Sequence, residues 1–332
     1  VIPSGNSDSA SLDNVFELLN ISGQPAPLAK LMLIPDAWSK RRKTVSKAHQ
    51  QLFNFLNSTI EPWDGPAAIC ATDAKWVLAA TDRNGLRPLR YTITSDDLFF
   101  AGSESGMIKI PEEKIIDKGK LGPGQIIAID LKKGKLFKDQ EIKDYLAKDY
   151  KKYNKQIIDL DKRISSQNEE ANFTGEELKK RQYLSGLSIE DLELILHPMA
   201  EEGKEASGSM GDDTPVAVLS SHFRPVSHYF RQNFSQVTNP PIDSLRESKV
   251  MSLKTRFGNL GNILDFDNLT EEDIFVLDSP ILSNSQFDKF INYFGKNYKI
   301  IDCTFDENQS LEDAIEKLKK DAEIAVREGI TQ

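Results

Sequence analysis

Cysteine is scarce in this sequence: its two thiols, Cys70 and Cys303, lie far apart in apolar, strand-like runs. Two isolated cysteines exclude a disulfide framework and any all-cysteine metal or iron–sulfur site. Neither lies in the polar, turn-like surroundings that are typical of a reactive thiol. We therefore expect both to be buried structural side chains of a protein from a reducing compartment.

Long hydrophobic runs and excess positive charge are also missing. No apolar stretch approaches the roughly 20 residues that a membrane-spanning helix needs, and residues 1–5 do not resemble a signal peptide. The chain has 42 Lys and Arg against 51 Asp and Glu, a net charge of −9. A nucleic-acid surface needs clustered positive charge. We predict a soluble cytoplasmic protein with neither nucleic-acid nor membrane partners.

Both ends of the sequence look cut. No Met precedes Val1, and the first residues form a loop that leads directly into a predicted helix. At the other end, a predicted helix over residues 311–328 precedes residues 329–332, which resemble a helix stop leading towards a strand. We interpret the 332 residues as a piece of a longer protein, with room for two domains.

The first half of the sequence predicts helices followed by strands. Apolar spacing predicts helices over residues 11–19, 25–33 and 46–55. Turn residues then separate short strand-like segments at 67–72, 76–81, 89–94, 98–101, 125–130 and 135–137. An antiparallel sheet that follows helices predicts an α+β domain.

The second half predicts an alternation of helices and strands. A charged connector over residues 142–172 is expected to be helical and to end in a polar loop. The predicted elements after it are helices 174–183 and 188–201, strand 216–219, helix 225–234, strand 274–277, helix 283–294, strand 299–303 and helix 311–328. This order favours an α/β layer with parallel strand pairing.

Short polar motifs carry the chemical information. Residues 7–9 (Ser-Asp-Ser) are typical of a helix cap, with a ligand contact as the alternative. Residues 82–89 hold Asn84 and Gly85, a pair that predicts positive φ angles in a tight turn. The Asp and two Arg of this turn would bind an anion or close the turn as an internal ion pair.

Residue types and their spacing alone do not give a complete catalytic set. Residues 208–215 combine glycines with two carboxylates, but further acidic ligands at metal-binding spacing and the Gly-Lys-Ser/Thr ending of a P-loop are missing. The four histidines do not follow metal-ligand spacing. A reactive Cys–His pair stays open as an alternative, since spacing alone does not exclude it.

The order of the motifs resembles a known family. Residues 7–10 (SDSA), 61–67 (EPWDGPA), 82–89 (DRNGLRPL), 103–106 (SESG) and 122–124 (GPG) resemble the later part of a class II glutamine amidotransferase domain. Residues 208–215 (GSMGDDTP) and 230–243 (FRQNFSQVTNPPID) resemble the central domain of the glutamate synthase large subunit. The sequence is thus similar to a fragment of that subunit.

The resemblance implies a fold and a division into domains. Residues 1–150 would be the C-terminal part of an α+β amidotransferase domain of the Ntn-hydrolase type, layered αββα. Residues 151–173 would form a connector, and residues 174–332 the N-terminal part of an α/β central domain.

The resemblance also implies a reaction in two halves. An N-terminal cysteine hydrolyses glutamine with its own α-amino group as base, and ammonia passes through a tunnel to 2-oxoglutarate, which is reduced to glutamate. FMN and an iron–sulfur cluster serve the second half, with a small subunit or ferredoxin as electron donor. Val1 has no nucleophilic side chain, so we expect no catalytic residue and no bound cofactor in this fragment, which alone would be inactive.

Three residues match functional positions of the family. Asp8 matches the aspartate that contacts the α-amino group of glutamine, a suitable role because carboxylate–ammonium hydrogen bonds are strong. Met210 and Thr238 match positions that line the ammonia path, with ordinary packing as the alternative. The pair Asn84 and Gly85 does not match the family's oxyanion-hole motif.

Two other functions stay open at this stage. One is a different class II amidotransferase with another acceptor domain, against which residues 238–243 (TNPPID) argue. The other is a non-catalytic structural fragment. The sequence does not set the electron donor, which would be ferredoxin, NADPH or NADH.

Overall fold

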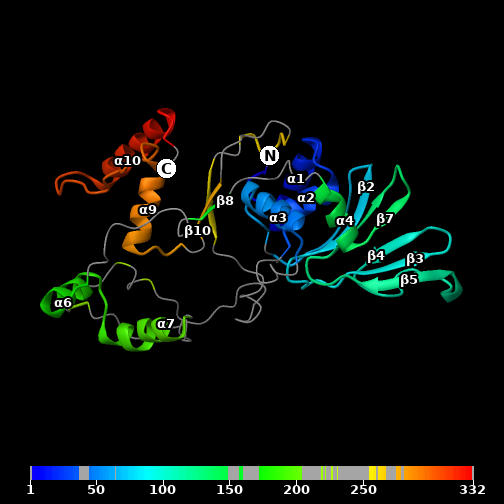
Figure 1. Ribbon diagram of the computed structural model, residues 1–332, viewed down its shortest axis with the longest axis horizontal. Coiled ribbons are helices and arrows are strands. Elements are labelled where there is room, and N and C mark those ends of the chain that lie inside the picture. The colour runs from blue at the N-terminus through cyan, green and yellow to red at the C-terminus, as the bar shows by residue number, and fades with distance from the viewer. Residues whose placement is uncertain are drawn as a thin grey trace. The chain divides into compact units, whose positions relative to one another are not determined.

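The computed structural model describes residues 2–36, 45–63, 65–148, 157–159, 172–203, 254–258, 261–266, 274–277 and 280–330, with the single positions 218, 219, 221, 226 and 230. The chain divides into two compact units, residues 1–168 with 242–332, and residues 169–241. Figure 1 labels most of their helices and strands. Within the described ranges, no helix is both long and apolar enough to cross a membrane.

Three helices open the chain, as predicted. They are α1 (Asp8–Ile21), α2 (Ala26–Leu33) and α3 (Lys47–Thr59). The hydroxyl oxygens of Ser7 and Ser46 accept backbone N–H groups of the first turns of α1 and α3. Every residue of α2 is buried, so this helix lies inside the fold rather than on its surface.

Seven strands form two antiparallel sheets. The four-stranded sheet has the order β1 (Ala68–Thr72), β2 (Trp76–Thr81), β6 (Ile126–Asp130) and β7 (Lys135–Phe137). The three-stranded sheet has the order β4 (Phe99–Gly102), β3 (Arg90–Thr94) and β5 (Ile115–Lys120). The predicted strands of this region are confirmed, and β5 is additional.

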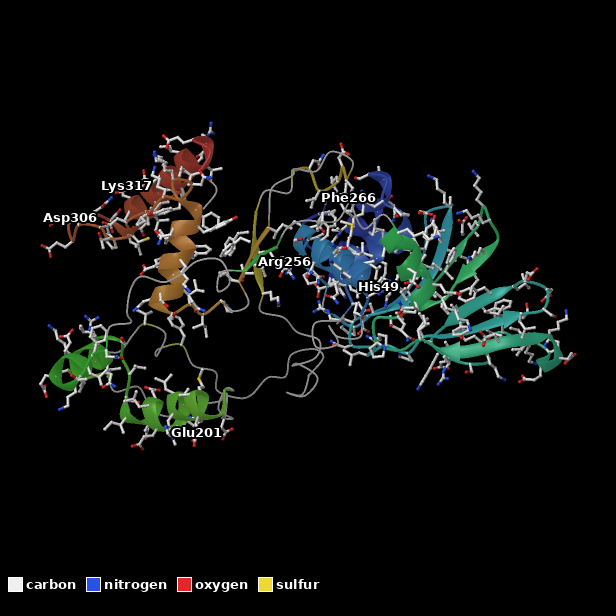
Figure 2. The ribbon with its side chains drawn as sticks, in the orientation of Figure 1. His49, Glu201, Arg256, Phe266, Asp306 and Lys317 are labelled. Atoms are coloured by element: carbon white, nitrogen blue, oxygen red, sulfur yellow. The ribbon has the colours of Figure 1, made fainter. Side chains whose placement is uncertain are left out.

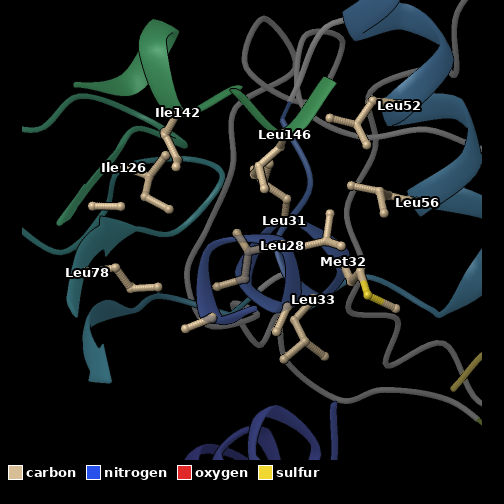
Figure 3. Packing of buried hydrophobic residues seen from close by; sticks show 14 of the residues in the cluster. Leu28, Leu31, Met32, Leu33, Leu52, Leu56, Leu78, Ile126, Ile142 and Leu146 are labelled. Atoms are coloured by element: carbon tan, nitrogen blue, oxygen red, sulfur yellow. The ribbon is translucent and has the colours of Figure 1, made fainter. Parts of the chain in front are cut away.

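The core follows from the alternation of side chains along each strand. Leu78 of β2 points towards the helices, whereas its neighbour Ala79 belongs to the cluster between the two sheets. Figure 3 shows Leu31 and Met32 of α2 beside Leu52 of α3 in the helical part of this core, which also includes helix α4 (Asp139–Leu146). The four-stranded sheet therefore contributes Leu78 to the cluster that includes the helices, and Ala79 to a second cluster that includes Tyr91 and Phe99 of the three-stranded sheet.

A small mixed sheet lies further along the chain. Strand β10 (Ile274–Leu277) pairs in parallel with β8 (Ile157–Asp159) and antiparallel with β9 (Thr255–Phe257). The predicted strand 274–277 is confirmed, but the helical prediction for the connector is wrong at residues 157–159. A strand at that position gains backbone hydrogen bonds from β10, which local propensity does not reveal.

Two helices follow the mixed sheet, α9 (Asn284–Phe294) and α10 (Leu311–Arg327), and both match the prediction. The predicted strand 299–303 is wrong, because these residues form no ladder and Ile300 is 80% exposed. Both edges of β10 are occupied by β8 and β9. Residues 299–303 therefore have no free edge of that strand to pair with.

In the described part of the other compact unit, the regular elements are helical. These are α6 (Gly175–Leu184), the π-helical segment η4 (Asp191–Leu196) and α7 (His197–Glu202), in agreement with the predicted helices. Positions 218 and 219 form a turn instead of the end of the predicted strand 216–219. Most of the predicted helix 225–234 lies outside the described residues.

Candidate functional site

Asp8 is exposed in the first turn of α1. Ser7 precedes it in extended conformation, and its Oγ accepts a hydrogen bond from the Ala10 N–H at 3.3 Å. The predicted cap is therefore confirmed, and Ser7 provides it. Among the described residues, no hydrogen bond or ion pair engages the Asp8 carboxylate. The helix N-terminus favours this negative charge, so Asp8 is an available anion for a cationic ligand.

The other two predicted site residues, Met210 and Thr238, lie outside the described residues. The same holds for residues 208–215 and, apart from position 230, for residues 230–243. Their part in an ammonia path stays a prediction.

Asp82 organises the turn that carries the amidotransferase-like motif. Asp82 is 1% exposed, and its carboxylate accepts hydrogen bonds from the backbone N–H groups of Ala67 at 3.1 Å and Asn84 at 2.9 Å. The Leu86 N–H donates to both carboxylate oxygens, at 3.2 and 3.1 Å. Gly85 has a positive φ of 66°, but Asn84 does not, so the predicted pair is right at one position. Asp82 thus serves the turn itself.

The glycine turn at residues 122–124 packs directly against this motif. The Gly124 N–H donates to the Asp82 carbonyl at 2.8 Å, and the Thr81 hydroxyl donates to the Gly122 carbonyl at 2.6 Å. A Cβ atom on Gly85 would lie 2.9 Å from Pro123. Two motifs that are distant in the sequence therefore form one junction, with no room for a side chain at Gly85.

A buried group of charges supports the junction from the helical side. Lys30 is fully buried and its Nζ donates to the Gly124 carbonyl at 3.2 Å. Lys143 of α4 lies beside it, with Nζ 2.9 Å from Asp36 Oδ2 and 2.8 Å from Asp139 Oδ1. Burial, then the charge of Lys143, lowers the pKa of Lys30 to about 7.

Sequence reasoning did not find this group of charges. The available signal was Lys30 itself, the one charged residue in the apolar run 26–34. A lone charge within a buried helix requires partners, because an unpaired charge is costly to bury. Its partners come from other parts of the chain and cannot be read from local sequence.

The predicted burial of both cysteines is wrong. Cys70 and Cys303 are exposed. Cys70 alternates along β1 with Ile69 and Ala71, which pack towards the helices, so its side chain points the other way. The thiol is nevertheless partly buried, and this partial burial raises the pKa of Cys70. A raised pKa makes a poor nucleophile at neutral pH.

His49 is the buried histidine of the first helices. Its Nε2 lies 2.8 Å from Asp144 Oδ1, and its Nδ1 lies 3.2 Å from Gln140 Nε2, so it links α3 to α4. Neither cysteine takes part in these contacts. In the described part of the chain, no three His, Cys, Asp or Glu side chains gather in a way that would hold a metal ion.

Comparison with known families gives two successive matches along the chain. Residues 1–155 match the class-II glutamine amidotransferases, and residues 180–332 match the glutamate synthase central domain.

Known relatives match the chain over its whole length. The glutamate synthase [NADPH] large chain of Azospirillum brasilense is 51% identical over 339 residues, which cover 100% of this chain and 22% of the relative. The corresponding large chain of Bacillus subtilis is 37% identical, with 100% and 22% covered. Glutamate synthase [NADH] of Saccharomyces cerevisiae is 39% identical, with 99% and 16% covered.

The chain therefore spans about a fifth of the length of the relatives it matches. It carries the class II amidotransferase region and the central-domain region in the same order as these large chains. The chain belongs to the glutamate synthase family and corresponds to a part of its large chain.

Proposed function

We propose that this chain completes the glutamine-binding amidotransferase domain, residues 1–150, of a glutamate synthase and leads through a connector, 151–173, into the central domain, 174–332. The whole protein hydrolyses glutamine and passes ammonia to 2-oxoglutarate, which is reduced to glutamate in the cytoplasm. The full-length similarity to glutamate synthase large chains carries this proposal. The match over residues 180–332 supports it over an amidotransferase with another acceptor domain.

Within this chain, Asp8 is the residue that would bind glutamine for hydrolysis. Its carboxylate is exposed, and the cap is provided by Ser7, so Asp8 remains free to accept a hydrogen bond from the α-ammonium group of glutamine. A charge-assisted hydrogen bond of this kind fixes the orientation of the substrate. Because the ammonium is distant from the amide that reacts, the contact contributes equally to the bound ground state and the transition state.

Replacing Asp8 with Asn in the full-length protein tests this role. We expect KM for glutamine to rise about ten- to a hundred-fold, the range for loss of a hydrogen bond to a charged group, with kcat little changed. Glutamate formation from added ammonia should stay at the wild-type rate, because it does not use the glutamine site.

The matched control is Asp13→Asn, which removes a negative charge from an exposed position of the same helix. It should leave KM unchanged. An equal rise in KM for both variants would reduce the effect to general electrostatics and remove Asp8 from the substrate site. Loss of ammonia-dependent synthesis in Asp8→Asn would point to a folding defect instead.

The nucleophile of glutamine hydrolysis is proposed to lie outside this chain. Cys70 has a raised pKa, and Cys303 lies in a segment without strand pairing. We expect the isolated chain to release no glutamate from glutamine. Turnover that disappears in Cys70→Ala or Cys303→Ala would instead assign the chemistry to an internal thiol.

The redox groups are also proposed to lie elsewhere in the whole protein. An iron–sulfur cluster is typically held by four cysteines, and this chain has two that are far apart. The relatives named above differ in their electron donor, NADPH or NADH, yet all align with the whole chain. We infer that FMN, the cluster and the donor specificity belong to other segments or to a small subunit, or to ferredoxin as partner.

The layered αββα architecture is part of this proposal. Three of its layers are supported by the packing of helices on the four-stranded sheet and of that sheet on β3, β4 and β5. The outer face of the three-stranded sheet carries exposed Ile116 and a cavity of about 740 Å³ beside the loop that follows β4. A fourth, helical layer of the whole protein would cover this face.

A further inference from the structure

Phe266 connects the part of the chain that matches the amidotransferases with the part that matches the central domain. It belongs to the range 180–332, which matches the central domain, but it is 6% exposed within the core of the amidotransferase region. Figure 2 labels Phe266. Its ring meets the ring of Phe55 in α3 edge to face, with centroids 5.2 Å apart and planes at 86°. Leu264 packs against the same core. The core of the first family region is thus completed by residues of the second.

Helix α3 has a buried phenylalanine on each of two opposite sides. Phe53 and Phe55 are two residues apart, so their side chains point about 200° apart around the helix axis. Both are nearly fully buried, at 2% and 1% exposure. The Phe53 side carries His49, whose ring lies 5.8 Å from that of Phe53 and whose nitrogens contact α4. The Phe55 side is the one that meets Phe266.

The segment that carries Phe266 has local order of its own. The Asn262 side-chain oxygen accepts the Leu264 N–H at 3.1 Å, and the Asn262 carbonyl accepts the Asp265 N–H at 2.9 Å. Gly261, which precedes this turn, has a positive φ of 71°. Such a turn limits the conformational entropy lost when Leu264 and Phe266 pack into the core.

We propose that residues 261–266 form a docking segment through which the central-domain region closes the core of the amidotransferase region, so that the order of α3 depends on it. Without Phe266, the contact between its ring and the Phe55 ring would be lost. Truncation of a buried Phe removes its contacts and leaves a cavity that the surroundings only partly fill. The effect should concentrate on α3, the helix that carries Phe55. The inference concerns packing and does not require the proposed enzymatic activity.

Amide hydrogen exchange on the 332-residue chain tests the docking segment. In Phe266→Ala, the amides of α3 should exchange roughly ten-fold faster or more than in wild type, while those of β3 and β4 keep their rates. The control is Phe290→Ala, which removes the same side chain from α9. Phe290 contacts Phe257 and Phe275, with centroids at 5.2 and 5.5 Å, and belongs to a separate cluster. This variant should accelerate exchange of β10 and leave α3 unchanged.

Two further variants keep the proposal falsifiable. Phe266→Leu retains an apolar side chain and should change α3 exchange by an intermediate factor, also if the alanine variant does not fold. In Phe55→Ala the contact is already lost, so adding Phe266→Ala should accelerate α3 exchange by less than the product of the two single effects. Unchanged α3 exchange in Phe266→Ala, or an equal acceleration by Phe290→Ala, would overturn the proposal.

Discussion

The two halves of the chain use amphipathic helices differently. In the first region, residues 2–148, the helices cover one face of a sheet, and α2 is buried along its whole length. In the second region, the described residues from 172 onwards, α6 and α9 have no buried residue, and α10 buries only Ala314 and Ala325. Apolar periodicity creates a helix in both regions, but the large core forms only in the first. In the second region, α9 contributes partly buried rings such as Phe290 to a small cluster around Phe275 and Leu277.

The largest effect should come from the buried charges of the first region. Lys143→Met leaves the carboxylates of Asp36 and Asp139 without their shared cation, because Lys143 is 4% exposed and contacts both. We expect the free energy of unfolding to fall by about 3–5 kcal/mol. Tryptophan fluorescence during urea unfolding measures this, since all three tryptophans lie in the first region of the sequence.

The control for this experiment is Lys118→Met. Lys118 forms an ion pair with Glu112 in which both side chains are exposed. Solvent screens such a pair, so the urea midpoint should hardly move. If Lys143→Met is as mild as Lys118→Met, the buried charges do not hold the first region together, and the contrast between the two halves weakens.

A pair of leucine truncations tests the contrast directly. Leu31 of α2 is 0% exposed, whereas Leu194 of η4 is 66% exposed. Leu31→Ala should lower the free energy of unfolding by about 2–5 kcal/mol, because it leaves a cavity. Leu194→Ala should change it by no more than about 0.5 kcal/mol. Thermal unfolding followed by circular dichroism compares them, and a large loss in Leu194→Ala would reveal a core that involves η4.

The pH dependence of stability should report the burial of Lys30. Its pKa is about 7 in the folded chain against an ordinary value of 10.5, so between these values the unfolded state holds a proton that the folded state lacks. Stability conferred at this site therefore rises with pH across the window and is constant below it. Lys30→Met removes this dependence.

The measurement is the difference in unfolding free energy between Lys30→Met and wild type. It should be most favourable to the variant near pH 7 and should decline by about 1.4 kcal/mol per pH unit as pH rises towards 10. Subtracting wild type cancels the other titrating groups. A difference that does not change with pH would mean that Lys30 keeps its proton in the folded chain.

The sequence predicted where helices and strands lie better than it predicted which face of each strand is buried. Strand β1 was expected, but its alternation alone does not say whether Cys70 or Ile69 meets the helices. Strand β5 was missed because its alternate residues Lys118 and Lys120 are exposed, and its pairing with β3 is set by distant residues. The exposed thiol and the extra strand have the same cause, which is that a strand's partners lie outside its own sequence.

The candidate site also has features that local sequence predicts and features that depend on contacts between distant residues. The cap at Ser7 and the exposed Asp8 follow from local chemistry, because a helix start needs hydrogen-bond acceptors. The junction of Asp82 with the turn at 122–124 depends on contacts between distant residues. Local sequence therefore predicts the turn of the motif but not the segment that packs against it. Lys30 adds a third part that local sequence gives only as a lone charge.

The smallest effect compares one cap from each region. Ser46 accepts the His49 N–H at 3.2 Å at the start of α3, and Ser283 accepts the Gln286 N–H at 3.3 Å at the start of α9. Replacing either with Ala should cost about 1 kcal/mol. Since α3 belongs to the core, Ser46→Ala should lower the midpoint of the tryptophan-detected transition. Since α9 has no buried residue, Ser283→Ala should leave that midpoint unchanged and only accelerate amide exchange in α9. A shift of the same transition in both variants would mean that the two regions unfold as one cooperative unit, joined more tightly than the exposure of their helices implies.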